Sequence, residues 1–382
     1  MKLSPRLVIL LLLTGCSRSA ELIPPHGQAT FAQYQQETTR WVEQHRLFQS
    51  SDRVAELRWN TPQEWRPAGV PDQGILLIHG LGDSPGSFTD IGPELAKDGF
   101  LIRTVLLPGQ GTQPKDLIGV SADDWRSIVN EQMAILRKDV GKVWLGGFST
   151  GANLAIEYAY QHQDVKGLLL FSPAIKANEP LVATTPFIAL FRNWLRKPKP
   201  GYPTQRATRY MTVPTNGFAQ FWRTSSAAQQ KLNQHPYDKP VLIVATEHDS
   251  VLDTQSLLAH FDRQFTSPQS RLIWYGYPQP QNALSNRVLI RTDSLPDQHI
   301  SQFSHMSVLF SPQNPVYGVH GSDRICENGQ SDADYLACRQ GAEVWFSDWG
   351  LRETGKIHAR LTWNPWFSWQ NRVMKQVVSD IP

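Results

Sequence analysis

The segment Gly147-Phe148-Ser149-Thr150-Gly151 has the spacing that presents a serine as a nucleophile. In the G-x-S-x-G pattern the serine occupies a sharp turn between a strand and a helix, and the glycines let neighbouring chain approach closely. At a helix N-terminus, unpaired N–H groups and the helix dipole also favour a developing negative charge. These residue types therefore predict nucleophilic attack by Ser149. The alternative is an ordinary glycine-rich loop with a capping serine.

The residues on both sides of Ser149 fit such a turn. Upstream, residues 142–145 are rich in β-formers and lie between Gly141 and Gly146, which is typical of a buried strand. Downstream, residues 152–160 combine helix formers with many apolar side chains, which predicts a largely buried helix. Strand, serine and helix thus follow in the order that the pattern requires.

A second segment offers the hydrogen-bond donors that acyl transfer needs. Residues 74–79 form an apolar run that leads into Gly80-Leu81-Gly82-Asp83-Ser84, so a strand ending in a glycine-punctuated loop is predicted. Attack on a carbonyl creates an oxyanion, which two well-aimed N–H groups stabilise. We expect these donors to be the backbone N–H of Thr150, the residue after the nucleophile, and that of Leu81.

Together these segments resemble the α/β-hydrolases of the esterase and lipase type, similar to bacterial carboxylesterases and monoacylglycerol lipases. The resemblance implies an α/β-hydrolase fold: a mostly parallel central sheet with helices on both faces, an inserted cap, a Ser-His-Asp triad, and no metal or organic cofactor. Two departures, Gln110 where many relatives have His and Ala152 where a further Gly is common, bear mainly on the subfamily. The matching segments are residues 77–84, Ser87-Phe88, residues 107–111, Asp124-Trp125 and residues 147–151.

The resemblance also implies where the acid of the triad lies. A serine nucleophile needs a base, which needs an orienting carboxylate, and on this fold the acid and then the base follow the serine in the chain. Asp249 follows an apolar strand-like run, residues 240–246, and precedes a small residue and an aliphatic one, as in relatives. Glu247 is the alternative acid. Asp253 is predicted to cap the next helix, residues 254–261.

His305 resembles the C-terminal histidine that serves as the base in this family. A small residue, Ser304, precedes it and aliphatic residues follow it. His299, in a polar stretch, and His320, in a glycine-flanked loop, are its competitors. About thirty residues separate the strand expected at residues 271–275 from His305.

The coarse organisation predicted is one large domain, residues 28–382, with two insertions. The first, about residues 175–239, is a cap rich in aromatic and aliphatic side chains. The second is about residues 277–303, within which residues 286–291 are either an extra strand or the last strand of the sheet. A helix is expected within residues 28–50. The expected strands are residues 54–59, 74–79, 101–105, 143–145, 165–171 and 241–245.

The N-terminus predicts export to the bacterial cell envelope. Lys2 and Arg6 flank a short apolar run, residues 7–13, which together read as a secretory signal over residues 1–15. The sequence Leu13-Thr14-Gly15-Cys16 resembles a bacterial lipobox, which implies lipidation of Cys16, a tether over residues 16–27, and an outer-membrane address. The alternative is a plain signal peptide whose cysteine is incidental.

The two remaining cysteines and the net charge allow further predictions. Cys326 and Cys338 form an even pair in an oxidising compartment, which predicts a disulfide; two free buried thiols are the alternative. The cysteine spacing lacks the paired sets of a zinc site. The formal net charge is +3, without a basic run typical of nucleic-acid binding.

The sequence therefore predicts a membrane-tethered serine hydrolase of carboxylic esters, such as acylglycerols. The same triad would also serve thioester or amide hydrolysis, since fold and triad do not determine the leaving group. A hypothesis of another class is a catalytically silent binding lipoprotein on the same scaffold.

Overall fold

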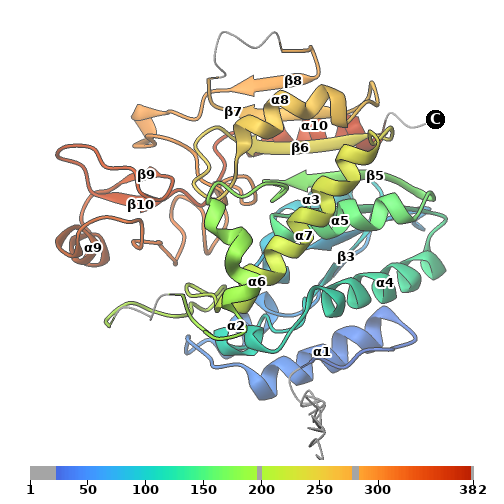
Figure 1. Ribbon diagram of the computed structural model, residues 1–382, viewed down its shortest axis with the longest axis horizontal. Helices are drawn as coiled ribbons and strands as arrows, with labels where there is room; N and C mark the ends of the chain where they lie inside the picture. The colour runs from blue at the N-terminus through green and yellow to red at the C-terminus, as the bar shows by residue number, and fades with distance from the viewer. Residues whose placement is uncertain (1–22, 196–199, 278–283, 380–382) are drawn as a thin grey trace, which may run out of the picture.

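The computed structural model describes residues 23–195, 200–277 and 284–379, and its centre is an eight-stranded sheet (Figure 1). The strand order is β1-β3-β2-β4-β5-β6-β7-β8, and every pairing is parallel except that of β1 with β3. The strands are β1 (Glu64–Trp65), β2 (Gln73–Ile78), β3 (Phe100–Val105), β4 (Lys142–Phe148), β5 (Val165–Phe171), β6 (Val241–Thr246), β7 (Arg271–Tyr275) and β8 (Val288–Arg291).

Helices cover both faces of this sheet, because successive strand residues point to opposite sides. In β2, Leu76 and Ile78 belong to one apolar cluster, while Ile75 and Leu77 belong to another. The first cluster includes residues of α1 (Phe31–His45), α4 (Ala122–Asp139), α5 (Thr150–Gln161), α7 (Thr215–Gln234) and α8 (Thr254–Gln264). The second includes residues of α3 (Ile91–Lys97) and α10 (Phe367–Ser379).

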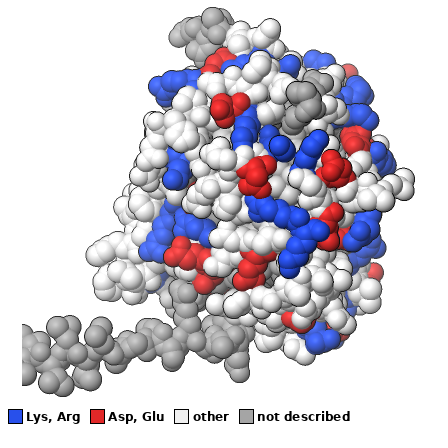
Figure 2. Space-filling view, turned by 90° about the vertical axis from the view of Figure 1, so that its right-hand side faces the viewer, with Lys and Arg blue, Asp and Glu red and all other residues white. Residues whose placement is uncertain are grey.

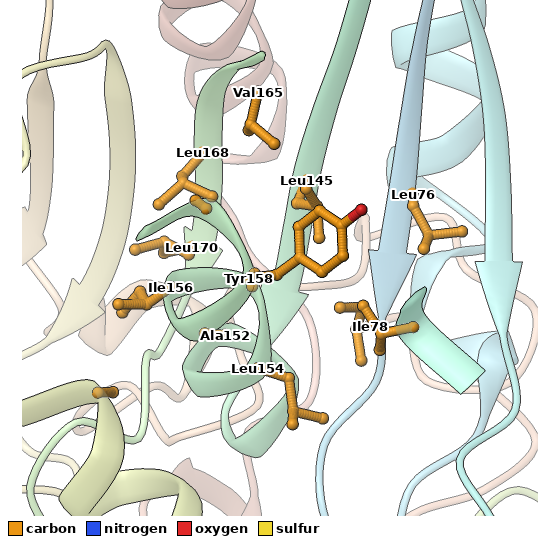
Figure 3. Packing of buried hydrophobic residues seen from close by; sticks show 14 of the residues in the cluster. Leu76, Ile78, Leu145, Ala152, Leu154, Ile156, Tyr158, Val165, Leu168 and Leu170 are labelled. Atoms are coloured by element: carbon orange, nitrogen blue, oxygen red, sulfur yellow. The ribbon is translucent and has the colours of Figure 1, made fainter. Parts of the chain in front are cut away.

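The central strands are almost continuously apolar because both of their faces are buried. Figure 3 shows side chains of α5, such as Ile156 and Tyr158, lying over Leu145 of β4 and Leu170 of β5. This packing holds the beginning of α5 at the end of β4. The predicted α/β-hydrolase fold is confirmed by this sheet and its two helical layers.

The strand predicted at residues 54–59 is wrong, because this segment is the helix α2 (Arg53–Trp59). Asp52 caps it by accepting a hydrogen bond from the backbone N–H of Ala55 at 3.0 Å. Glu56 is buried and pairs with the Arg46 guanidinium at 2.7 Å, which fixes this helix against the end of α1. The apolar residues of the segment suggested a strand, but a cap and a buried ion pair outweigh that local preference.

The segment before His305 contributes the last strand of the sheet. β8 pairs in parallel with β7 and forms one edge, so it lies within the sheet rather than in a separate hairpin. Residues 278–283 of the predicted second insertion lie outside the described residues.

The predicted cap, residues 175–239, divides into two parts. Its first part contains a short 3-10 turn (Pro180–Thr184) and α6 (Thr185–Ile188). Its last part is α7, which packs against α5 and so extends the helical layer. Near its start, Ala177 bridges to Leu252 of the loop that follows β6.

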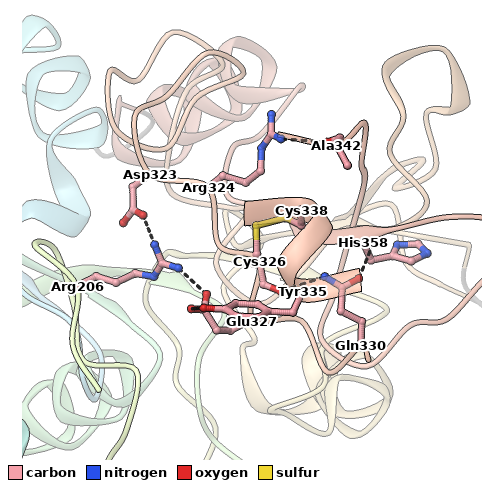
Figure 4. Close-up of a disulfide and its surroundings, with 10 residues drawn as sticks. All are labelled: Arg206, Asp323, Arg324, Cys326, Glu327, Gln330, Tyr335, Cys338, Ala342 and His358. Carbon is pink, nitrogen blue, oxygen red and sulfur yellow. Dashed lines mark hydrogen bonds and ion pairs between the residues drawn. A yellow bond between two sulfur atoms is a disulfide. The ribbon is translucent and has the colours of Figure 1, made fainter. Parts of the chain in front are cut away.

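A separate module follows the last strand, and we call residues 322–360 the C-terminal module. It contains α9 (Asp332–Arg339) and a small parallel sheet of β9 (Trp345–Ser347) and β10 (His358–Arg360), which lie to one side of the main sheet in Figure 1. The structure joins Cys326 to Cys338 by a disulfide with a Cα–Cα distance of 5.8 Å. Arg206 contacts this module through Asp323 and Glu327 (Figure 4).

Charges of both signs are interspersed over the face drawn in Figure 2. Among the described residues, no helix has the length and apolar character needed to cross a bilayer. Cys16, the predicted signal over residues 1–15 and most of the predicted tether lie outside the described part of the chain.

Candidate active site

Ser149 lies at the carboxyl end of β4, where the chain turns into α5. Its backbone has φ 54° and ψ −117°, a conformation that L-residues rarely adopt and that costs about 1–3 kcal/mol. The neighbouring loop after β2 lies at the same edge, because β2 and β4 are adjacent parallel strands. The strand order reverses between β2 and β4, and ligands in open α/β sheets bind beside the carboxyl ends of the strands at such a point.

The two glycines of the pentapeptide make this turn possible. A Cβ on Gly151 would lie 2.0 Å from the carbonyl oxygen of Ile78, and one on Gly147 would lie 2.3 Å from the backbone carbon of Gly151. Both contacts are with backbone, which cannot move aside as a flexible side chain can. The helix therefore approaches the strands at a distance that only glycine allows.

Asp249 and His305 form a hydrogen-bonded pair. Nδ1 of His305 lies 2.7 Å from Oδ2 of Asp249, and both side chains are largely buried. The other carboxylate oxygen accepts the backbone N–H groups of Val251 and Leu252, at 2.9 and 3.1 Å. With Nδ1–H donated to the carboxylate, Nε2 is the ring nitrogen left to exchange a proton.

The pair lies next to Ser149. The rings of His305 and Phe148, the residue before Ser149, are 5.0 Å apart. The alternative acid and one of the alternative bases have other partners. Glu247 accepts the backbone N–H of Tyr277, and Nδ1 of His299 lies 3.3 Å from the Glu343 carboxylate. His320 is exposed in a turn. The structure thus brings Asp249 and His305 together at the serine.

The loop after β2 lies close against Ser149. A Cβ on Gly80 would lie 3.1 Å from Cβ of Ser149. His79 anchors this loop: its Nδ1 donates to the carbonyl of Gly80 at 2.9 Å, and its Nε2 accepts the N–H of Leu107 at 3.1 Å. Burial lowers the pKa of His79 to about 4, so the ring is neutral and serves as a structural link at physiological pH.

The two N–H groups expected to stabilise an oxyanion lie on this loop and on α5. Thr150 is the first residue of α5, so its N–H has no acceptor within the helix. Among the described residues, the N–H of Leu81 makes no hydrogen bond either. Both donors are therefore available to a ligand beside Ser149.

Gln110 has a structural role in the site that the sequence did not reveal. Its side-chain oxygen accepts the backbone N–H of Gly82 at 2.6 Å, and the carbonyl of Gly82 accepts the N–H of Tyr210 at 2.7 Å. Both backbone polar groups of Gly82, the residue after Leu81, are thus hydrogen-bonded. Gln110 therefore positions the loop that carries Leu81, although we expected this departure to bear mainly on the subfamily.

We predict that Gln110→Ala lowers kcat for ester hydrolysis about 10-fold, with a smaller change in KM. The substitution removes the acceptor of the Gly82 N–H, so the loop that carries Leu81 loses its alignment. Steady-state kinetics with p-nitrophenyl butyrate measure the effect. Gln113→Ala, a nearby glutamine without a side-chain hydrogen bond among the described residues, is the control. A wild-type kcat for Gln110→Ala would show that the loop holds itself in place.

A second carboxylate, that of Asp83, lies close to His305. Burial raises the pKa of Asp83, while the charges of Arg209 and His305 act in the opposite direction. The Arg209 guanidinium lies 3.6 Å from the Asp83 carboxylate and 3.0 Å from Sδ of Met306. Arg209 thereby connects the loop after β2 with Met306, the residue that follows His305.

Sequence reasoning missed Asp83, Gln110 and Arg209 as parts of the site. Asp83 and Gln110 lie inside the motifs that carried the resemblance, and their polar side chains in otherwise apolar or glycine-rich segments were the available signal. Arg209 comes from the predicted cap, where no local pattern indicates a contact with the site. Among the described residues, no cluster of three or more His, Cys, Asp or Glu side chains could hold a metal ion.

Comparison with known proteins identifies the family. A family model described as serine aminopeptidase, S33, matches residues 69–276, just over half of the chain. The chain belongs to the S33 serine aminopeptidase family of hydrolases. The matched S33 region includes Leu81, Ser149 and Asp249, and it ends before His305 and the C-terminal module.

Individual relatives match parts of the chain. The chain is 25% identical over 185 residues to the thermostable monoacylglycerol lipase of Bacillus sp. strain H-257, covering 47% of this chain and 71% of that protein. It is 32% identical over 99 residues to an uncharacterized protein of Mycobacterium bovis, covering 26% and 28% of the two chains. With its S33 family membership, this makes the chain a lipase- and esterase-like α/β-hydrolase.

Solved structures with a similar arrangement include two lipolytic enzymes. A metagenome-derived lipolytic enzyme is 20% identical, with a TM-score of 0.47 over 56% of this chain and 86% of its own. A soluble variant of the monoglyceride lipase of Saccharomyces cerevisiae is 18% identical, with a TM-score of 0.45 over 56% and 81%.

Proposed function

We propose that this protein hydrolyses carboxylic esters through an acyl-enzyme, with Ser149 as nucleophile, His305 as base and Asp249 as the orienting acid. The observation that carries the proposal is the position of the strained Ser149 turn beside the hydrogen-bonded Asp249–His305 pair. A serine alone is a weak nucleophile, and this arrangement supplies the base and the carboxylate that activate it.

In the proposed reaction, Nε2 of His305 takes the proton of Ser149 as the hydroxyl attacks the ester carbonyl. Asp249 holds the ring in the required tautomer and stabilises the imidazolium that forms. The N–H groups of Leu81 and Thr150 donate to the oxyanion. His305 then protonates the leaving alcohol, and water activated by the same residue hydrolyses the acyl-enzyme.

Lipid esters are the proposed substrate class. Support comes from the first part of the cap segment, which exposes four large apolar side chains, more than isolated surface residues would explain. Phe187 is 69% exposed and Phe191 is 78% exposed, and their rings lie 5.4 Å apart. Leu181 and Leu190 are exposed beside them in the sequence. The relative from Bacillus is named a monoacylglycerol lipase, which agrees with this class.

We also propose the cellular setting. The lipobox-like sequence ending at Cys16 supports removal of residues 1–15, lipidation of Cys16, and attachment to the bacterial outer membrane. A lipid anchor would keep the enzyme near its lipid substrates. Amide hydrolysis is the second candidate reaction, because the family description names an aminopeptidase and the same triad would serve it.

Labelling with a fluorophosphonate probe tests the proposal. We expect covalent labelling of the wild-type protein, with the modified peptide containing Ser149, and faster hydrolysis of p-nitrophenyl esters than of amino-acid p-nitroanilides. Absence of labelling at Ser149 would end the enzyme hypothesis in favour of a silent binding protein. Faster anilide hydrolysis would favour the amidase. Rates that fall steadily from short to long acyl chains would count against lipid esters.

A further inference from the structure

The backbone of His305 is held from two sides by residues outside the triad. Its carbonyl accepts the hydroxyl of Ser172 at 2.8 Å, and its N–H points at Oδ1 of Asp348 at 3.4 Å. Ser172 follows β5 directly and has φ 40°, an uncommon conformation for a residue other than glycine. The position of the base is thus set both by the central sheet and by a residue 43 positions later in the chain.

Asp348 also binds the loop that carries the acid. Its Oδ2 accepts the backbone N–H of Ser250, the residue after Asp249, at 2.6 Å. Asp348 is only 2% exposed, and its carboxylate lies between the two loops that bring Asp249 and His305 together. One side chain therefore contacts the backbone of His305 and that of Ser250, the residue after Asp249.

The C-terminal module places Asp348 in this position. The side-chain amide of Asn328 donates to the carbonyl of Asp348 and to the hydroxyl of Ser347, each at 3.0 Å. Asn328 in turn accepts Nε of Arg360 at 2.8 Å. Asn328 lies two residues after Cys326, whose disulfide to Cys338 closes the module (Figure 4). A continuous set of contacts thus leads from the disulfide to the acid–base pair.

The groups around Asp348 offset the cost of burying its carboxylate. Burial and the nearby charge of Asp249 raise the pKa of the Asp348 carboxyl, while Arg360 acts in the opposite direction. A buried carboxylate beside a second one is costly to maintain without a counter-charge and hydrogen-bond donors. Arg360, Ser250 and His305 supply these, and all three belong to the module or to the site that it contacts.

We propose that Asp348 is a positioning residue for the Asp249–His305 pair, and that the disulfide-closed module serves to present it. This inference rests on the proposed function, since it concerns the same triad. The module follows the region that the family model matches, residues 69–276, so the proposal concerns a part of this chain outside that match. Its consequence is that catalysis depends on a disulfide that follows all three triad residues in the sequence.

Asp348→Asn is the first test. An asparagine keeps the size of the side chain but can accept only one of the two backbone N–H groups, so the loops of the acid and base lose their common anchor. We expect kcat for p-nitrophenyl butyrate to fall about 30-fold with KM changed less than about 3-fold, because misplacement of catalytic groups affects the reaction step. The rate constant for fluorophosphonate labelling should fall to a similar extent.

The matched control is Glu343→Gln, which neutralises a carboxylate on the surface of the same module. Glu343 lies 3.3 Å from His299, and its side chain is 78% exposed. We expect wild-type kinetics for this variant. Rates are expressed per folded molecule, with the folded fraction measured by circular dichroism, so that a loss of stability alone does not register as a loss of kcat.

The double variant Cys326→Ser/Cys338→Ser tests the second half of the proposal and does not depend on Asp348→Asn folding. We expect a lower kcat in the same direction, and the triple variant that includes Asp348→Asn should lose little more than Asp348→Asn alone. Residues that act through one contact are non-additive in this way. Multiplicative losses would mean that the disulfide acts separately from Asp348.

The outcomes also separate this inference from the proposed function. If the wild-type protein is not labelled at Ser149, the proposed function fails, and this inference fails with it. If the wild-type protein is labelled, and folded Asp348→Asn and the disulfide variant both react at the wild-type rate, only the positioning role is overturned. An equal loss in Glu343→Gln would also overturn it, by showing a general effect of charge.

Discussion

Ser149→Ala is expected to lower kcat for ester hydrolysis about a million-fold, which is the loss seen when the nucleophile of a triad is removed. Without the hydroxyl, no acyl-enzyme can form, and only the oxyanion donors and substrate binding remain. Hydrolysis of p-nitrophenyl butyrate by highly purified protein, together with mass spectrometry of the trapped acyl-enzyme, measures the effect. Ser226→Ala, on α7, is the control, because alanine suits a helix at least as well as serine.

The same experiment extends to the base. His305→Ala should cost about as much as Ser149→Ala, and the double variant should lose little beyond either one, since the residues act as a unit. Substantial residual hydrolysis in Ser149→Ala, with a normal circular dichroism spectrum, would contradict the proposed nucleophile. It would direct attention to another residue at the same edge of the sheet.

Gly151→Ala is expected to destabilise the fold by about 3 kcal/mol or more, the upper range for overpacking a tight site. The added methyl would lie 2.0 Å from the carbonyl oxygen of Ile78 and 2.6 Å from that of His79. Both atoms are backbone at the end of β2, so relief requires α5 to move away from the sheet. Movement of α5 would also displace Ser149, so activity should fall together with stability.

Urea unfolding followed by fluorescence measures the change in the free energy of unfolding. Gly69→Ala is the matched control, because a Cβ at Gly69 meets no atom within 4 Å among the described residues. Its effect should stay within about 0.5 kcal/mol, as for other surface substitutions. A Gly151→Ala protein with wild-type stability would mean that α5 can shift without cost, which would contradict the close packing around Ser149.

The parts of the fold that the sequence predicted are those determined by short-range patterns. β4, the Ser149 turn and α5 follow one another in the chain, so periodicity and the two glycines were enough to predict them. β2, β5, β6 and β7 are apolar runs bounded by turn residues, and they were found for the same reason. β8 remained ambiguous because it is only half-buried at a sheet edge.

The remaining features depend on contacts between distant segments. α2 was mistaken for a strand because its buried Glu56 makes sense only with Arg46 beside it. The contacts of Asp348 with His305 and Ser250 span 43 and 98 positions. The sequence around a single loop aspartate does not indicate such partners, because most aspartates lie on the protein surface. Tertiary packing, and not local preference, determines what such a residue does.

Both edge strands of the main sheet are short, and this limits aggregation of one copy of the protein with another. β1 at one edge has two residues, and β8 at the other has four. The edge strand β8 also carries a charged side chain, that of Arg291, whose Cζ lies 4.2 Å from the ring centre of Trp369. Short strands and charged side chains leave few free N–H and C=O groups for another chain to pair with. The sheet is therefore protected against edge-to-edge aggregation, although its inner strands are almost entirely apolar.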